Sequence, residues 1–265
     1  MKPEDIEENI VKKVCLVIGA GAGIGGSVGS RFAKEGYHAA LCRRSDARGL
    51  QTLVNRIEEE GGTATGHLLN AVEDDAIENL VTEVEKIGPI HTVLFNLGAQ
   101  IGNRSLETTT LKNFELGWKM ACFGLFRLAK VVIPAMESRG GGTLLVTSAT
   151  AAVRGNAGQH SHAAAMGGRR MLCQSLNAEY ASRGIHVAHV IIDGAVDAPD
   201  TLGKMLGQTQ FNALREARGG DKDGLLLPEQ IAETYFHLAH QHRSAWTHEL
   251  DLRAHSDLAW WNHEG

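Results

Sequence analysis

The sequence predicts an α/β protein in which seven mostly parallel strands form a doubly wound sheet with helices on both faces. Three observations support this prediction. An apolar run near the start of the chain ends in a glycine-rich turn, and segments with strand and helix patterns then alternate along the chain. The length of 265 residues suits one large domain, which we expect to span residues 1–265.

The glycine-rich turn follows the first predicted strand, residues 14–18, which is apolar without alternation, as in a strand buried on both faces. Helical spacing begins directly after the turn. Glycines let the backbone approach an anion closely, and a helix N-terminus attracts a pyrophosphate. A strand and turn that bind nothing are the alternative, but strand, glycines and helix occur in the order that dinucleotide binding requires. The residues expected to bind the dinucleotide are Gly19, Gly21, Gly23, Ile24 and Gly25.

The second predicted strand, residues 37–42, ends at Arg43 and Arg44. An acidic residue here would bind the ribose hydroxyls of NAD(H), whereas arginine pairs with the 2′-phosphate of NADP(H). We therefore expect NADP(H), with solvated loop charges as the alternative interpretation of the two arginines.

The remaining elements continue the alternation. We expect helices at 47–60, 76–87, 111–138, 159–182 and 228–240, and strands at 63–69, 91–95, 143–147, 185–192 and 246–252, the last at a sheet edge. Residues 193–227 are rich in polar residues and glycine and are predicted to be a substrate-covering loop with short helices.

Ligands of such sheets bind outside the carboxyl ends of the strands. The residues that follow these ends and are expected to contact the cofactor are Asn70, Asn96, Gly98 and Val196. Those expected to face the substrate are Asn96, Gln100, Ser148, Arg154, His162, Asp193 and Asp197.

The whole chain resembles the short-chain dehydrogenase/reductase family. The resemblance lies in IGAGAGIG at 18–25, NLGA at 96–99 where the family has NNAG, and IIDG at 191–194 where it has Pro-Gly. Residues 237–252 resemble one divergent subgroup of the family. The resemblance implies a Rossmann-type fold, a nicotinamide cofactor and a homotetramer or homodimer.

The chain departs from this family at the catalytic tetrad of Asn, Ser, Tyr and Lys. Alignment with the family places Ala149 at the Ser position, with Ser148 just before it, His162 at the Tyr, Met166 at the Lys and Ala121 at the Asn. All four positions have lost the usual residue. The side chains at Ala149 and Met166 can neither polarise a carbonyl nor lower the pKa of a proton donor.

Three residues remain as catalytic candidates. His162 is a candidate general acid, since imidazole titrates near neutral pH, or else a polar residue that lines the cofactor cleft. Ser148, which directly precedes the aligned Ser position, is a second catalytic candidate. Asp193 either stabilises a cation near the nicotinamide or caps a turn.

These features predict an atypical NADPH-dependent reductase of an activated small molecule, either a carbonyl or an iminium compound, with natural-product biosynthesis as the suggested context. An iminium substrate needs no proton donor, which fits the altered tetrad and is an analogy with divergent family members. The alternatives are an isomerase or cyclase that uses the same cleft, and an NADP(H)-binding pseudoenzyme or scaffold.

The composition of the chain argues against several classes of binding partner. The net charge of −5, without a basic stripe, argues against nucleic acid and anionic membranes. The N-terminus has no apolar signal core, and the four cysteines are widely spaced within apolar segments, so we expect a cytoplasmic protein. The histidines at 237–248 lack further ligands, so no metal is expected. Trp260 and Trp261 are expected to dock on this chain or on a neighbouring one.

Overall fold

The computed structural model describes residues 12–98 and 105–262. They form one sheet of seven strands in the order β3-β2-β1-β4-β5-β6-β7, and every strand pair is parallel. The order reverses between β1 and β4, as in a doubly wound sheet. The strands are β1 (Val14–Ile18), β2 (His38–Arg43), β3 (Thr63–Leu68), β4 (Ile90–Phe95), β5 (Gly142–Ala149), β6 (Ile185–Ile192) and β7 (Glu249–Leu252). The predicted fold class is confirmed.

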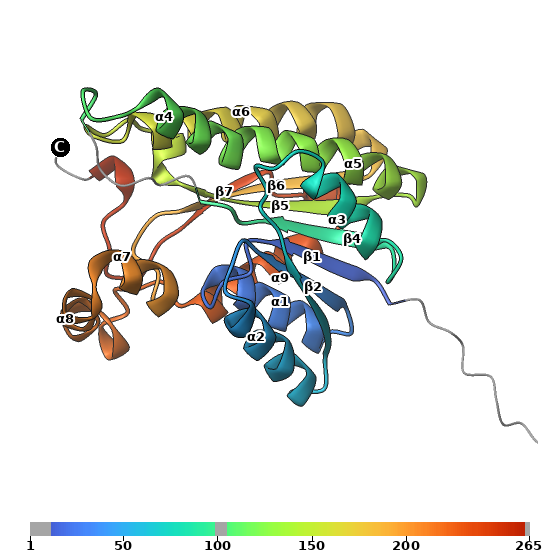
Figure 1. The fold of residues 1–265 in the computed structure, drawn as a ribbon, viewed down its shortest axis with the longest axis horizontal. Helices are drawn as coiled ribbons and strands as arrows, with labels where there is room; N and C mark the ends of the chain where they lie inside the picture. Colours follow the sequence, from blue (N-terminus) through green and yellow to red (C-terminus); the bar gives the residue numbers. More distant parts are fainter. Residues whose placement is uncertain (1–11, 99–104, 263–265) are drawn as a thin grey trace, which may run out of the picture.

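Helices cover both faces of the sheet (Figure 1). On one face lie α3 (Ala76–Val84), α5 (Gly124–Ser138) and α6 (His160–Tyr180), and on the other α1 (Ile24–Lys34), α2 (Ala47–Glu59) and α9 (Pro228–Ala239). Each face has its own apolar core, because the strands of a parallel sheet send buried side chains to both sides.

The long helical region is interrupted, which the sequence analysis did not predict. It consists of α4 (Leu111–Trp118), a π-helical turn at Lys119–Phe123, and α5. A π-helical turn shifts the hydrogen-bonding pattern of the backbone and is common at functional sites. Here it contains Ala121, which is fully buried and whose carbonyl oxygen accepts a hydrogen bond from the Arg169 side chain.

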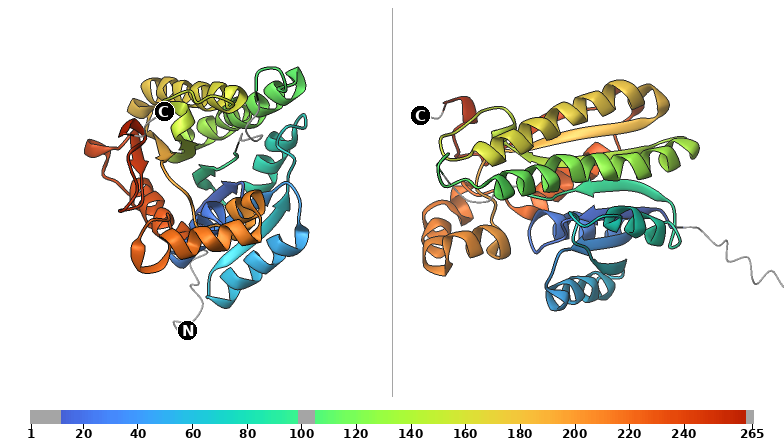
Figure 2. Two further views of the ribbon diagram at one scale, coloured as in Figure 1. Left: turned by 90° about the vertical axis from the view of Figure 1, so that its left-hand side faces the viewer. Right: turned by 45° about the horizontal axis from the view of Figure 1, so that its top comes forward.

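The segment predicted to cover the substrate lies beyond the carboxyl ends of the strands. It contains a π-helical turn at Pro199–Gly203, then α7 (Lys204–Leu206) and α8 (Gln208–Arg218). In the left panel of Figure 2 these helices, in orange, lie across the strand ends. A single parallel bridge between Val196 and Leu226 joins the start and end of the segment.

Cysteines in the described part of the chain are free, and Cys15, Cys42 and Cys173 are buried. Burial raises the pKa of the Cys173 thiol to about 12. No helix within residues 12–98 and 105–262 is both long and apolar enough to cross a membrane. The prediction for the acidic N-terminus concerns residues outside the described part.

Candidate cofactor and substrate site

The turn between β1 and α1 is tight in the places where glycine is needed. Gly19 has φ +100°, and its carbonyl oxygen accepts a hydrogen bond of 3.0 Å from Nδ2 of Asn96. A Cβ atom on Gly25 would lie 2.2 Å from the Gly19 oxygen, so only glycine lets α1 start this close to the turn. A Cβ atom on Gly21, by contrast, would meet nothing within 4 Å among the described residues.

This geometry fits a pyrophosphate. The open side of Gly21 leaves room for a bulky group, and Gly23 is the N-cap of α1 without a side-chain cap. The first N–H groups of a helix have no acceptor within it, and the helix dipole favours an anion at this end. Gly19, Gly21, Gly23, Ile24 and Gly25 thus form a cradle where the sequence predicts one.

A small pocket of about 200 Å³ lies between this turn and α2. It is lined by Ala22, Arg43, Gly49, Thr52, Leu53, Arg56 and Asp200. The Arg43 guanidinium also pairs with Asp46 at 3.3 Å. Arg44 is exposed and is not among the described lining residues, whereas Arg56, which sequence reasoning missed, is one of them. Two arginine side chains, Arg43 from β2 and Arg56 from α2, therefore line the same pocket.

Asn70 follows β3, as predicted, but lines neither this pocket nor the larger one described next. Its Nδ2 donates to Oε1 of Glu73 at 2.8 Å, which closes the loop before α3.

The larger pocket, of about 310 Å³, lies at the carboxyl ends of β4, β5 and β6. Its lining residues are Ile24, Asn96, Leu97, Gly98, Thr147, Ser148, Ala149, His162, Met166, Arg169, Ile192, Val196, Ala198 and Thr201. The structure thus brings cofactor candidates from three segments together with two of the three catalytic candidates. Gln100, predicted nearby, lies outside the described residues.

Ser148 and His162 come to this pocket from different elements. Ser148 is the last residue but one of β5, and its hydroxyl lies 3.9 Å from the sulfur of Met166. His162 lies in the first turn of α6 and lines the same pocket. The pocket wall between them is apolar, because Ala149 and Met166 supply no polar group there.

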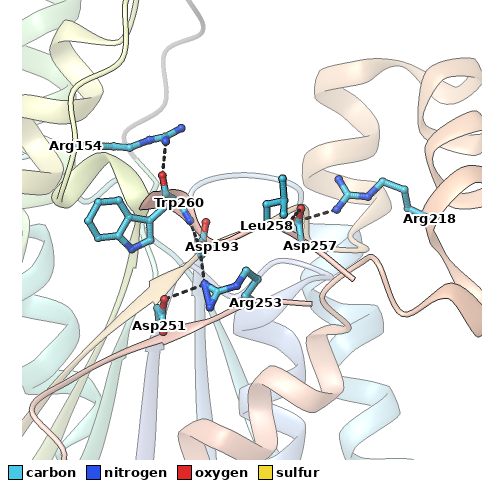
Figure 3. Close-up of polar contacts among 8 residues, drawn as sticks. All are labelled: Arg154, Asp193, Arg218, Asp251, Arg253, Asp257, Leu258 and Trp260. Carbon is cyan, nitrogen blue, oxygen red and sulfur yellow. Dashed lines mark hydrogen bonds and ion pairs between the residues drawn. The ribbon is translucent and has the colours of Figure 1, made fainter. Parts of the chain in front are cut away.

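Asp193 follows β6 but is not among the described residues that line the pocket. Its Oδ2 atom accepts hydrogen bonds of 2.9 Å from Nη1 of Arg253 and from the backbone nitrogen of Trp260 (Figure 3). Arg253 also contacts Asp251 at 3.1 Å. Of the two predicted roles, these contacts favour a structural one, in which Asp193 fixes the C-terminal segment.

Arg154 and Asp197 have similar structural contacts. Nη1 of Arg154 donates to the carbonyl oxygen of Trp260 at 2.6 Å, and Asp197 pairs with Arg215 at 2.6 Å. Neither residue is among the described lining residues of the larger pocket. Trp260 is therefore held by this chain through both of its backbone polar groups, whereas the ring of the neighbouring Trp261 lies under the Arg253 guanidinium at 5.0 Å.

Arg169 lines the larger pocket and was missed by the sequence analysis. Its residue exposure is 1%, and burial lowers the pKa of its guanidinium to about 10, which still leaves it charged at neutral pH. A signal was present in the sequence. The buried stripe of α6 runs through Met166, Arg169, Cys173 and Leu176 at helical spacing, so an arginine stands where an apolar side chain is usual.

The histidines near the C-terminus have local partners. His240 lies 3.3 Å from the Tyr37 hydroxyl and 2.8 Å from the Phe236 carbonyl oxygen. Across residues 12–98 and 105–262, no three His, Cys, Asp or Glu side chains are placed so that they could hold a metal ion together.

Comparison with known proteins agrees with this geometry. The profile of the short chain dehydrogenase family matches residues 13–204. The short-chain reductase protein NovJ of Streptomyces niveus is 31% identical over 232 residues, which are 86% of this chain and 87% of NovJ. The 3-oxoacyl-[acyl-carrier-protein] reductase FabG of Thermotoga maritima is 26% identical over 234 residues, 86% of this chain and 90% of that protein.

A solved structure is also similar. The short-chain dehydrogenase from Rhodopseudomonas palustris has a TM-score of 0.76 and 30% identity, and the match covers 92% of this chain and 99% of that one. With the parallel sheet, the glycine cradle and these matches, the chain belongs to the short-chain dehydrogenase/reductase family.

Proposed function

We propose that this protein is an atypical NADPH-dependent reductase of an activated small molecule, a carbonyl or an iminium compound. One observation carries the proposal. A single pocket of about 310 Å³ contains Ile24, Asn96 and Gly98 from the cofactor side together with Ser148 and His162. The names of NovJ and FabG, both reductases, support the reaction class.

The family binds NAD(H) or NADP(H), and Arg43 and Arg56 in the small pocket support NADP(H) here. When bound, NADPH supplies a hydride. The chain's own residues hold the pyrophosphate at the glycine cradle, and Asn96 fixes the turn through its bond to the Gly19 oxygen. Ile24, Val196 and Ala198 supply apolar side chains to the pocket wall.

A carbonyl substrate needs a proton as its oxygen becomes an alkoxide. His162 and Ser148 both line the pocket and carry groups that donate a proton or a hydrogen bond. We assign His162 as the general acid and Ser148 as a hydrogen-bond donor to the substrate oxygen. An iminium substrate would accept the hydride without either group.

We further propose a homodimer or homotetramer in the cytoplasm. Trp118, Phe123 and Phe126, which are 42%, 38% and 47% exposed, form an apolar surface along α4, the π-helical turn and α5. Such a surface is more typical of an interface than of solvent contact. The free buried cysteines support a reducing compartment.

The test is a turnover screen of cyclic ketones and cyclic iminium ions with NADPH. We expect one NADPH oxidised per product formed, and His162→Phe should lower the ketone rate and flatten its pH dependence. Turnover without loss of NADPH would identify an isomerase or cyclase instead. Tight NADPH binding without turnover of either class would support the pseudoenzyme.

A further inference from the structure

The Arg169 side chain reaches from α6 to the floor of the larger pocket. Its Nη2 donates to the Leu97 carbonyl oxygen and its Nη1 to the Thr147 carbonyl oxygen, both at 2.6 Å, while Nε donates to Ala121 at 3.0 Å. Leu97 follows β4 and Thr147 lies near the end of β5, and both line the pocket. The guanidinium therefore lies between the ends of the two central strands.

Within the described part of the chain, no carboxylate pairs with this buried cation. Its three bonds go to backbone oxygens and use three of the five N–H groups of a guanidinium. The described residues that line the pocket include no Asp or Glu. The next residue in α6 has the more common arrangement of an arginine with a carboxylate partner, since Arg170 forms a bidentate pair with Glu249 with both bonds at 2.7 Å.

A buried charge without a counter-ion costs folding free energy, because the charge has left water and gained no ionic partner. Met166 lies one helical turn before Arg169 on the same buried stripe and supplies only an apolar thioether. An apolar residue at position 169 would continue the buried stripe, although it would not donate to the three backbone oxygens that Arg169 contacts. The charge also raises the electrostatic potential of a pocket whose described lining contains no Asp or Glu and no other Arg or Lys.

We propose that Arg169 makes this pocket selective for substrates that carry or develop negative charge, and so for carbonyl compounds over preformed iminium ions. The inference rests on the proposed function and narrows its substrate class. When hydride adds to a carbonyl carbon, the π-electron pair moves to oxygen, and the resulting negative charge is stabilised by a nearby fixed cation until a proton arrives. An iminium ion is repelled by the same cation before reaction.

A binding measurement tests the charge preference without any turnover. Cyclohexanecarboxylate and cyclohexylammonium have the same ring and opposite charge, and neither can be reduced. With isothermal titration calorimetry, with and without NADPH, we expect the wild-type protein to bind the carboxylate at least about tenfold more tightly than the ammonium. Equal binding, preference for the ammonium, or no binding of the carboxylate by the wild-type protein would overturn the proposal.

Variants assign the preference to Arg169. Arg169→Gln should reduce the carboxylate-to-ammonium ratio to about one, whereas Arg170→Gln, the matched control one residue along α6, should keep the wild-type ratio. Circular dichroism and the melting temperature of each variant check the fold. If Arg169→Gln does not fold, Arg169→Lys replaces it and should keep the preference, because it keeps the charge. An unchanged ratio in a folded Arg169→Gln protein would contradict the inference.

Kinetics separates this inference from the proposed function. We expect kcat/KM of the wild type to be higher for a cyclic ketone than for the matched iminium ion, and Arg169→Gln to lower the ketone value on the order of 100-fold while sparing the iminium value. An equal loss for both substrates, or a wild-type preference for the iminium ion, refutes the role of Arg169 while leaving a reductase. Failure of both substrates to oxidise NADPH refutes the reductase, whereas the probe binding still reports on the pocket charge.

Discussion

At the scale of single residues, the two arginines after β2 have different surroundings although they are adjacent in sequence. The Arg43 side chain is 15% exposed and lines the small pocket beside the glycine cradle, whereas Arg44 is exposed. The sequence analysis assigned both arginines to the 2′-phosphate, because it could not tell which of the two side chains points toward the cofactor site. That direction depends on how the following helix packs. The pocket distinguishes them.

Arg43→Ala should therefore weaken NADPH binding about 30-fold and NADH binding much less, since a charge-assisted bond to a phosphate contributes about 2 kcal/mol. Arg44→Ala is the control and should change both affinities by less than about threefold. Fluorescence titration with each cofactor measures the two ratios. An equal loss of NADPH and NADH binding in Arg43→Ala would remove the argument for a 2′-phosphate site.

The tight glycine turn before α1 could be predicted because it depends on local constraints. Gly19 needs a positive φ and Gly25 a close backbone contact, and such needs are visible in a short sequence pattern. Arg56 and Arg169 could not be placed in this way, because their sites are formed by elements far apart in the chain. Asp193 was placed correctly at a strand end, but its partners Arg253 and Trp260 come from a segment about 60 residues later.

At the scale of elements, the segment after β7 is fastened to the sheet by a few polar contacts. Asp193, which is 3% exposed, binds both Arg253 and the backbone of Trp260, and Arg218 pairs with Asp257 at 2.8 Å (Figure 3). These contacts hold the segment next to the residues that cover the pocket. The segment is thus part of the scaffold around the site.

Asp193→Asn should lower the free energy of unfolding by about 2 kcal/mol, because the half-buried Arg253 guanidinium and the Trp260 N–H lose a buried, charged acceptor. Asp251→Asn is the matched control, since Asp251 is the more exposed partner of the same arginine, and it should cost less than about 1 kcal/mol. Urea unfolding measures both values, and hydrogen exchange of the Trp260 amide reports the local release. Equal costs for the two variants would show that burial of Asp193 does not matter.

Element boundaries followed the sequence closely where the apolar pattern was strong, as in β1 and α9. The break in the long helical region was missed because its apolar spacing continues through residues 119–123, and the π-helical turn coincides with a tertiary contact that a sequence pattern does not report. That contact is the bond from Arg169 to the Ala121 carbonyl oxygen. An apolar sequence pattern indicates which face of a helix is buried, but not which backbone carbonyl departs from the regular helical hydrogen-bonding pattern.

At the scale of the whole molecule, the fold contains buried histidines that should make it sensitive to acid. Burial lowers the pKa of His91 and of His189 from 6.5 to about 4. Between pH 6.5 and pH 4 these histidines bind protons in the unfolded chain but not in the folded chain. The contribution of the two neutral imidazoles to stability is therefore complete above about pH 6.5 and is lost as the pH falls toward 4. The Glu249 carboxylate affects the stability of the fold only at lower pH, because its hydrogen bond to Arg170 holds its pKa below the usual range.

The free energy of unfolding should fall by about 2 kcal/mol for each of the two histidines between pH 7 and pH 5. Urea unfolding at pH 7, 6 and 5 measures the slope, and His189→Gln should make it shallower, with His242→Gln, at an exposed position, as the control. A slope that is the same in His189→Gln and the wild type would show that His189 titrates normally in the folded protein.

The position of Arg169 also has a consequence for the order in which substitutions can accumulate. Residues 166 and 169 lie one turn apart on the same buried stripe, so a lysine introduced at position 166 would place its ammonium beside a guanidinium. The single change Met166→Lys is therefore expected to be unfavourable in this background, although position 166 is where the resemblance predicts the lysine of the family. We therefore expect a lysine to be tolerated at position 166 only when Arg169 has been replaced first, so the order of the two substitutions matters.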